Sequence, residues 1–112
     1  MNLVKGIINK GTFTAEGMKV AGIASTASGP VTLGFRAEDA RMVSKGGDIA
    51  APVYSMELLG DATMASTRID GALVAVKAAK DFRIRIGEIM QATIAPQLCH
   101  LFDADTGVRL EA

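Results

Sequence analysis

Short β-prone runs separated by glycine, aspartate and proline are the feature that most constrains the fold of this 112-residue chain. No window keeps a 3.6-residue apolar period over three helical turns, which argues against long amphipathic helices. The runs recur at spacings of about 8–12 residues, as strands do in barrels and sandwiches. Eighteen alanines and only five aromatic residues predict a core of small side chains. We therefore expect an all-β domain, a small barrel with short turns and at most single helical turns.

The dipeptide Asp70-Gly71 gives the clearest local prediction. It supplies the positive φ angles of a two-residue hairpin turn, so strands are expected on both sides of it, over 62–69 and 72–78. Proline cannot donate to a strand ladder, so Pro52 is expected at an edge or a bulge. Residues 37–40 are expected to form a turn or one helical turn. The remaining strands are expected over 3–8, 12–14, 18–23, 31–36, 49–59, 89–94 and 108–110.

The balance of charge constrains which classes of molecule this chain is expected to bind. Twelve basic and twelve acidic residues give zero net charge, whereas nucleic-acid-binding domains are usually strongly basic. We therefore expect no nucleic-acid partner. The densest basic stretch is diluted by Asp81, and we interpret it as a solvated strand edge carrying cations rather than a phosphate site. Its members are Lys77, Lys80, Arg83 and Arg85.

Motifs for nucleotide or metal chemistry are absent from the sequence. There is no GxxxxGK[ST] phosphate loop and no GxSxG elbow, so we expect no ATP hydrolysis by this chain. One cysteine and one histidine cannot fill a tetrahedral zinc site. Cys99 is interpreted as a small buried hydrophobe and His100 as a structural histidine, with Asp103 near enough to orient its ring. We expect no catalytic, cofactor-binding or metal-binding residue.

Membrane insertion and secretion are not expected either. No window reaches 18 consecutive apolar residues, and no basic segment followed by an apolar one opens the chain. The single cysteine fits a reducing compartment.

Three segments, taken in order, carry a family resemblance: GFRAED over 34–39, MELLGDAT over 56–63 and CHLFDADTGVRL over 99–110. Together they resemble the C-terminal regulatory domain of ATP-binding proteins of ABC importers for sugars and sn-glycerol-3-phosphate. This domain type is called TOBE and has an OB-like Greek-key barrel, related to the MOP domains. The resemblance covers residues 31–110, and residues 1–30 match more loosely as N-terminal strands and a loop. Ala37 stands where the family usually has proline, which loosens that turn.

The resemblance implies that residues 1–112 form a single non-catalytic regulatory and dimerisation domain. The expected parent is an ABC transporter ATPase that drives carbohydrate or glycerol-3-phosphate import, with ATP and Mg bound in a domain that this chain lacks. The implied partners are a second copy, the ATPase domain, a regulatory protein and, indirectly, the transporter membrane subunits. The implied location is cytoplasmic, peripheral to the inner membrane.

The motifs also imply interdomain or regulatory residues. Gly60 is expected to adopt a conformation barred to residues with a Cβ, Phe102 to lie in the core, and Asp103 to cap a turn with Thr106 and Gly107. The first motif is expected either to contact the ATPase domain or to form a local salt-bridged turn. The full set of candidates is Arg36, Glu38, Asp39, Glu57, Gly60, Thr63, His100 and Asp103.

An alternative function is binding of a small oxyanion such as molybdate, as in related domains. Its candidate donors are Thr63, Ser66, Thr67 and Lys77. Ordinary strand propensity explains the two threonines equally well. Binding of single-stranded nucleic acid requires stacking aromatics and a basic groove, which this composition does not offer. Likewise, Glu57 and Asp61 are a poor glycosidase pair, because a bend separates them.

Overall fold

The computed structural model describes residues 1–110, so the last two residues of the expected domain lie outside it. The described residues form eleven strands and two single-turn 3-10 helices, and all strand pairs are antiparallel. This confirms the all-β prediction. The elements are β1 (Asn2–Asn9), β2 (Thr12–Ala15), β3 (Met18–Val20), β4 (Gly29–Phe35), η1 (Ala37–Asp39), β5 (Ala40–Val43), β6 (Ile49–Leu58), β7 (Ala62–Ile69), β8 (Ala72–Ala79), β9 (Ile89–Ile94), η2 (Pro96–Leu98), β10 (His100–Asp103) and β11 (Arg109–Leu110).

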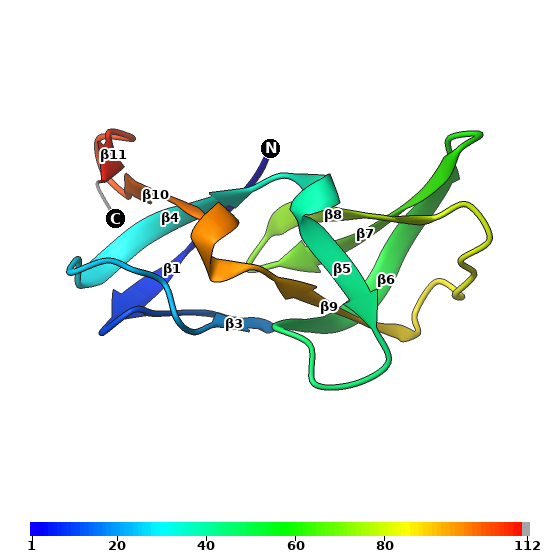
Figure 1. Ribbon diagram of the computed structural model, residues 1–112, viewed down its shortest axis with the longest axis horizontal. Helices are drawn as coiled ribbons and strands as arrows, with labels where there is room; N and C mark the ends of the chain where they lie inside the picture. The colour runs from blue at the N-terminus through cyan, green and yellow to red at the C-terminus, as the bar shows by residue number, and fades with distance from the viewer. Residues whose placement is uncertain (111–112) are drawn as a thin grey trace.

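One curled sheet carries the whole fold (Figure 1). Its strand order is β11-β10-β4-β1-β2-β3-β6-β7-β8, and β9 joins it by pairing with β6 and carries β5 on its other edge. Curling brings β8 back toward β1, so that the sheet forms a half-barrel consistent with the predicted OB-like class.

The long strand β6 changes partners at Pro52. Its first half pairs with β9, ending at Pro52 opposite Ile89, and its second half pairs with β7. The register slips between Val53 and Ser55, which is the irregularity predicted from the proline. The loop between β8 and β9 stabilises the bend, because the Val53 N–H donates to the Glu88 carbonyl at 2.8 Å.

The hairpin between β7 and β8 forms as predicted. Asp70 and Gly71 have φ angles of 49° and 82°, so both central residues are in the left-handed region that a type I′ turn requires. The register then runs from Ile69 opposite Ala72 to Ala62 opposite Ala79.

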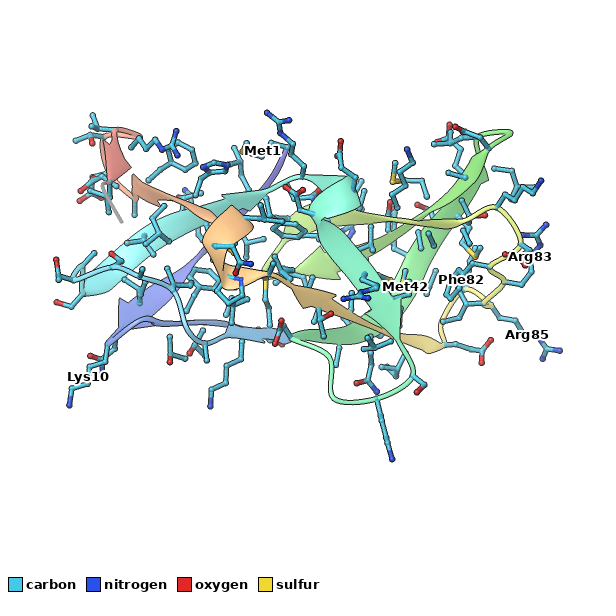
Figure 2. All side chains as sticks on the ribbon, in the orientation of Figure 1. Met1, Lys10, Met42, Phe82, Arg83 and Arg85 are labelled. Carbon is cyan, nitrogen blue, oxygen red and sulfur yellow. The ribbon has the colours of Figure 1, made fainter. Side chains whose placement is uncertain are left out.

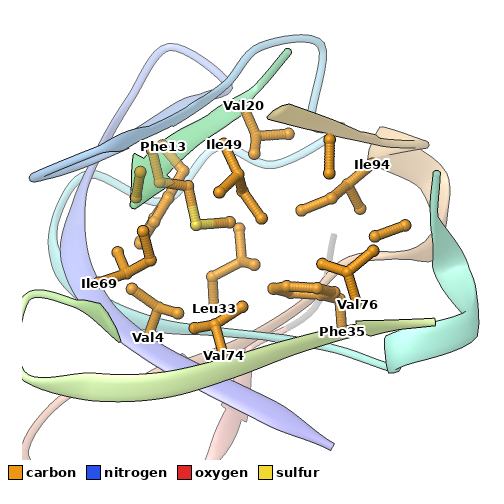
Figure 3. Close-up of a cluster of buried hydrophobic side chains, with 14 of the residues drawn as sticks. Val4, Phe13, Val20, Leu33, Phe35, Ile49, Ile69, Val74, Val76 and Ile94 are labelled. Carbon is orange, nitrogen blue, oxygen red and sulfur yellow. The ribbon is translucent and has the colours of Figure 1, made fainter. Parts of the chain in front are cut away.

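Aliphatic side chains of moderate size fill the inside of the barrel (Figure 3). Phe13 and Phe35 are the two phenylalanines buried there, and the rest of the core is mainly Val, Ile, Leu and Ala. Gly6 makes room for one ring, because a Cβ at this position would lie 2.5 Å from Phe13 Cζ. The expectation of a core built from small side chains holds only in part, because five of the eighteen alanines are buried there and Val, Ile and Leu make up most of the rest.

A side chain of β1 joins this inner strand to β8, the last strand of the curled sheet. The Asn2 Nδ2 donates to the Ala75 carbonyl at 2.7 Å, and the Ala75 N–H donates to Asn2 Oδ1 at 3.0 Å. The amide of Asn2 therefore reproduces both hydrogen bonds of one backbone rung between β1 and β8. We call this contact the seam.

Three expectations were wrong. The short strand β5 was not predicted, and its first residue, Ala40, was assigned to a turn. The predicted cationic strand edge is instead mostly a loop, since β8 ends at Ala79 and carries only Lys77 of the four cations. Figure 2 shows Phe82, Arg83 and Arg85 gathered on that loop, at the opposite end of the molecule from Lys10. Finally, the core position of β10 is taken by Leu101, and Phe102 is only half-buried.

Candidate functional site

The predicted site residues do not converge on one place. They lie in three regions: the turn that contains η1, the hairpin between β6 and β7, and the hairpin between β10 and β11. Each region holds one of the three family motifs. The arrangement therefore resembles a set of contact surfaces more than a catalytic centre.

The first region is the turn around η1, which is held by local hydrogen bonds. The Asp39 N–H donates to the Arg36 carbonyl at 2.9 Å, and the Arg36 N–H donates to Asp39 Oδ2 at 3.4 Å. These contacts fix the turn although Ala37 replaces the family proline. Glu38 is exposed at its apex.

A groove of about 780 Å³ opens beside this turn. It brings Glu38 and Asp39 to the same depression as Lys77 of β8, although these residues are far apart in sequence. Its lining therefore combines charged groups with apolar ones, as contact surfaces between domains often do. Its other lining residues are Ala40, Arg41, Met42, Ala78, Ala79, Phe82, Thr93, Ile94, Ala95 and Leu98.

The second region is the tip of the hairpin between β6 and β7. Gly60 has a φ of +81°, which confirms its predicted conformation. Glu57 and Asp61 are both exposed there. Thr63, by contrast, is fully buried, and its hydroxyl donates to the Lys80 carbonyl at 3.3 Å. Thr63 therefore anchors the loop that follows β8.

The third region is the hairpin between β10 and β11. Asp103 Oδ1 accepts hydrogen bonds from the N–H groups of Asp105 and Thr106, both at 2.9 Å, so Asp103 caps its turn as predicted. The same bonds, that from Thr106 first, lower the pKa of the Asp103 carboxyl.

His100 has a partner that the sequence did not indicate. Arg109 Nη2 lies 2.8 Å from His100 Nδ1. A guanidinium can only donate, so Nδ1 accepts and the imidazole is paired with Arg109 rather than oriented by Asp103. The sequence predicted a turn at Asp103 and a strand over 108–110 but no strand before that turn, so it did not pair these two residues.

The four anion-binding candidates are divided between two faces of the hairpin formed by β7 and β8. Lys77 pairs with Met64, and side chains alternate along a strand, so Lys77 and Ser66 face the other way from Thr63 and Thr67. The Thr67 hydroxyl is already donated to the Pro52 carbonyl at 2.6 Å. This arrangement does not favour the anion-binding alternative.

Cys99 is half-buried, and its Sγ lies 3.8 Å from the Ala95 carbonyl. Burial, with smaller contributions from the carboxylates of Asp48 and Asp39, raises the pKa of its thiol to about 11. The thiol is therefore protonated at neutral pH and is a poor nucleophile. Within residues 1–110 no three His, Cys, Asp or Glu side chains gather as metal ligands. In the same residues no helix has the length and apolar character needed to cross a membrane.

Comparison with known proteins finds similarity to ATP-binding proteins of importers and agrees with the resemblance inferred from the three motifs. No protein-family model matches. The chain is 33% identical over 112 residues to the sn-glycerol-3-phosphate import ATP-binding protein UgpC of Jannaschia sp. (strain CCS1), covering 98% of this chain and 32% of that protein. It is 32% identical over 113 residues to UgpC of Ruegeria sp. (strain TM1040), with the same coverage. UgpC 1 of Rhizobium johnstonii is 30% identical over 119 residues, 99% of this chain. The chain thus spans about a third of the length of these relatives.

Proposed function

We propose that this chain is the C-terminal, non-catalytic regulatory and dimerisation domain of an ABC importer ATPase for sn-glycerol-3-phosphate or a related carbohydrate. The observation that carries the proposal is the 30–33% identity to import ATP-binding proteins over nearly the whole chain. ATP and Mg are then bound by another domain of the full protein, which works at the cytoplasmic face of the membrane beside the transporter subunits.

The groove beside η1 is the surface that we assign to the ATPase domain. It contains two residues of the first family motif, Glu38 and Asp39, together with Lys77. Acidic and basic groups in one groove can select one orientation of a partner, because mismatched charges would be left buried and unpaired. A regulatory protein would act on the same ATPase by changing this contact.

The proposal is tested by a domain exchange between this chain and the Jannaschia relative. The matching third of the Jannaschia protein is replaced by this chain, and a second version lacks that third. We expect the exchanged protein to hydrolyse ATP and to dimerise in sedimentation experiments, the shortened protein to dimerise more weakly, and the chain alone to hydrolyse no ATP. Turnover by the purified chain would contradict the proposal, as would an exchanged protein that behaves like the shortened one.

A single substitution tests the assignment of the groove to the ATPase domain. Glu38→Lys in the exchanged protein reverses a charge in the groove and is expected to lower ATP hydrolysis several-fold, because the contact between domains is weakened. Glu16→Lys is the matched control, since Glu16 is exposed in the turn between β2 and β3, outside the groove. Equal effects of the two changes would remove the groove from the proposal.

A further inference from the structure

The barrel is open between β5 and β8. The strands β8, β7, β6, β9 and β5 follow one another through antiparallel pairs, so β5 runs parallel to β8. Some Cα atoms of β5 and β8 lie within 8 Å of each other, and both strands line the groove beside η1. Within residues 1–110, however, β5 pairs only with β9, and β8 pairs only with β7. Two unpaired strand edges therefore face each other across the groove.

The open edge of β8 presents the backbone groups of every second residue. Ala75 points both its N–H and its C=O away from β7, where the Asn2 amide binds them. Backbone groups alternate in direction along a strand, so those of Lys77 and Ala79 point the same way. The Ala79 carbonyl accepts the Phe82 N–H at 2.9 Å. In the described part of the chain, the N–H and C=O of Lys77 and the N–H of Ala79 have no hydrogen-bond partner.

The open edge of β5 is identified by its pairing with β9. The Ile94 N–H of β9 donates to Asp48 Oδ2 at 2.9 Å, on the side of β6. Ile94 lies opposite Ala40, so the backbone groups of these two residues point away from each other. Those of Ala40, and of Met42 two residues later, therefore point out of the sheet toward β8. Ala40 is only 5% exposed, and buried backbone groups are nearly always paired, so this edge needs a hydrogen-bond partner.

The width of the opening decides which partner fits. Adjacent strands lie about 4.8 Å apart, so a strand inserted from another domain would need β5 and β8 about 9.6 Å apart. The two strands approach each other more closely than this, so an inserted strand does not fit where they are nearest. A small inward movement, by contrast, brings their edges to pairing distance.

We propose that β5 and β8 pair with each other in a second, closed state of this chain. In that state the Met42 N–H donates to the Lys77 carbonyl, the Ala79 N–H donates to the Met42 carbonyl, and the Lys77 N–H donates to the Ala40 carbonyl. A shift of two residues in either direction would give Met42 a carbonyl that is already occupied, that of Ala75 or that of Ala79. The closed state therefore has one register.

Two cations oppose this closure. In the closed register Arg41 lies opposite Lys77, and both residues are exposed and line the groove. Like charges directly opposite each other destabilise a pair of strands. Glu38 and Asp39 line the same groove and offset part of the repulsion. The charges of Arg41 and Lys77 therefore favour the open state, in which the groove is available.

The two states give the groove a regulatory role. A partner seated in the groove keeps β5 from reaching β8, and closure removes the surface that the partner contacts. Each event therefore disfavours the other, because the partner binds the two states with different affinity. This link to the ATPase domain rests on the proposed function, whereas the closure itself does not.

A disulfide between β5 and β8 reports the closed state. Met42 and Ala78 lie opposite each other in the closed register, and a disulfide requires Cα atoms within about 7 Å. The isolated chain therefore carries Met42→Cys and Ala78→Cys, with Cys99→Ala to remove the native thiol. The rate of disulfide formation with oxidised glutathione measures how often the two strands meet.

Charge reversals in this three-fold variant test the cause of the opening. Arg41→Glu should raise the rate of disulfide formation about fivefold, because opposite charges replace like charges across the opening. Adding Lys77→Glu to Arg41→Glu makes the charges alike again and should return the rate to its starting value. Lys19→Glu, exposed on β3 outside the groove, makes the same change in net charge and should leave the rate unchanged.

Hydrogen exchange tests the register. In the oxidised chain, the amides of Met42, Lys77 and Ala79 should exchange about tenfold more slowly, or less, than in the reduced chain, because each gains a backbone acceptor. Leu73 lies on the same edge of β8 but outside the groove, and its amide should exchange equally fast in both.

The link to the ATPase domain is tested in the exchanged protein carrying the same cysteine pair. Oxidation should lower ATP hydrolysis several-fold, and reduction should restore it; the exchanged protein without this pair is the control for oxidation. If no disulfide forms, if its rate ignores the charges, or if the three amides are not protected, the closed state is overturned and the proposed function stands. If closure occurs but oxidation leaves ATP hydrolysis unchanged, the closed state stands and the assignment of the groove to the ATPase domain is overturned.

Discussion

Asn2→Ala is the most informative test of the fold, because it removes the seam between β1 and β8 without touching the core. The two hydrogen bonds of the Asn2 amide, at 2.7 and 3.0 Å, both go to the backbone of Ala75. These residues are 73 positions apart, so the contact fixes the closure of the sheet rather than any local structure.

The expected cost follows from those two bonds. A hydrogen bond contributes about 1 kcal/mol net, and a backbone group left unpaired in a partly buried place costs about 1–3 kcal/mol. Asn2 and Ala75 are half-buried, and water can partly replace the lost amide. We therefore expect a loss of about 2 kcal/mol in the free energy of unfolding. With an unfolding entropy near 2.1 cal/mol/K per residue, that loss lowers Tm by roughly 8 °C for a chain of this length.

The assay is urea unfolding followed by circular dichroism, with hydrogen exchange of the Ala75 amide as a local readout. Asn9→Ala is the matched control, because Asn9 is an exposed residue at the other end of β1. A surface change of this kind should stay within about 0.5 kcal/mol. The reasoning is refuted if both variants lose equally little stability, or if the Ala75 amide exchanges at the same rate in Asn2→Ala as in the unmodified chain.

Three further predictions concern single groups. Gly6→Ala places a Cβ 2.5 Å from the ring of Phe13 and should cost about 2–3 kcal/mol in urea unfolding; an unchanged midpoint would contradict this packing. Iodoacetamide at pH 8 should modify Cys99 about 100-fold more slowly in the folded chain than in urea, because burial raises its thiol pKa from 9.0 to about 11; equal rates would show an accessible thiolate. The lowered pKa of Asp103 means that its stabilising contribution is present above the ordinary value of 3.8 and is lost as pH falls through the folded value. Asp103→Asn should therefore reduce the difference in urea midpoint between pH 7 and pH 3, and an unchanged difference would exclude this role.

Local sequence patterns were sufficient to predict the structure where a few adjacent residues determine the backbone conformation. The turn at Asp70-Gly71 requires two positive φ angles, and that requirement alone placed β7 and β8 within one residue of their bounds. Pro52 likewise indicated an irregular strand, because the missing N–H is a property of the residue itself. The all-β class followed from many such short signals.

Contacts between distant segments could not be predicted in the same way. β5 has only four residues, and it is a strand because β9 supplies its ladder, not because its own sequence favours one. Leu101 and Phe102 are both apolar, so the sequence did not decide which faces the core. The pairing of Asn2 with Ala75 depends on how the whole sheet curls.

The groove beside η1 is separate from a depression of about 590 Å³ whose lining includes Leu3, Thr32 and Ala72. The two hollows share no lining residue. Yet β8 contributes to both, through Ala72 at the depression and Lys77 at the groove. Ala75 lies between them, where Asn2 ties β8 to β1. The Asn2 amide therefore holds β8 to β1 between the groove and the depression, so a partner that displaces β8 at the groove would strain these two hydrogen bonds.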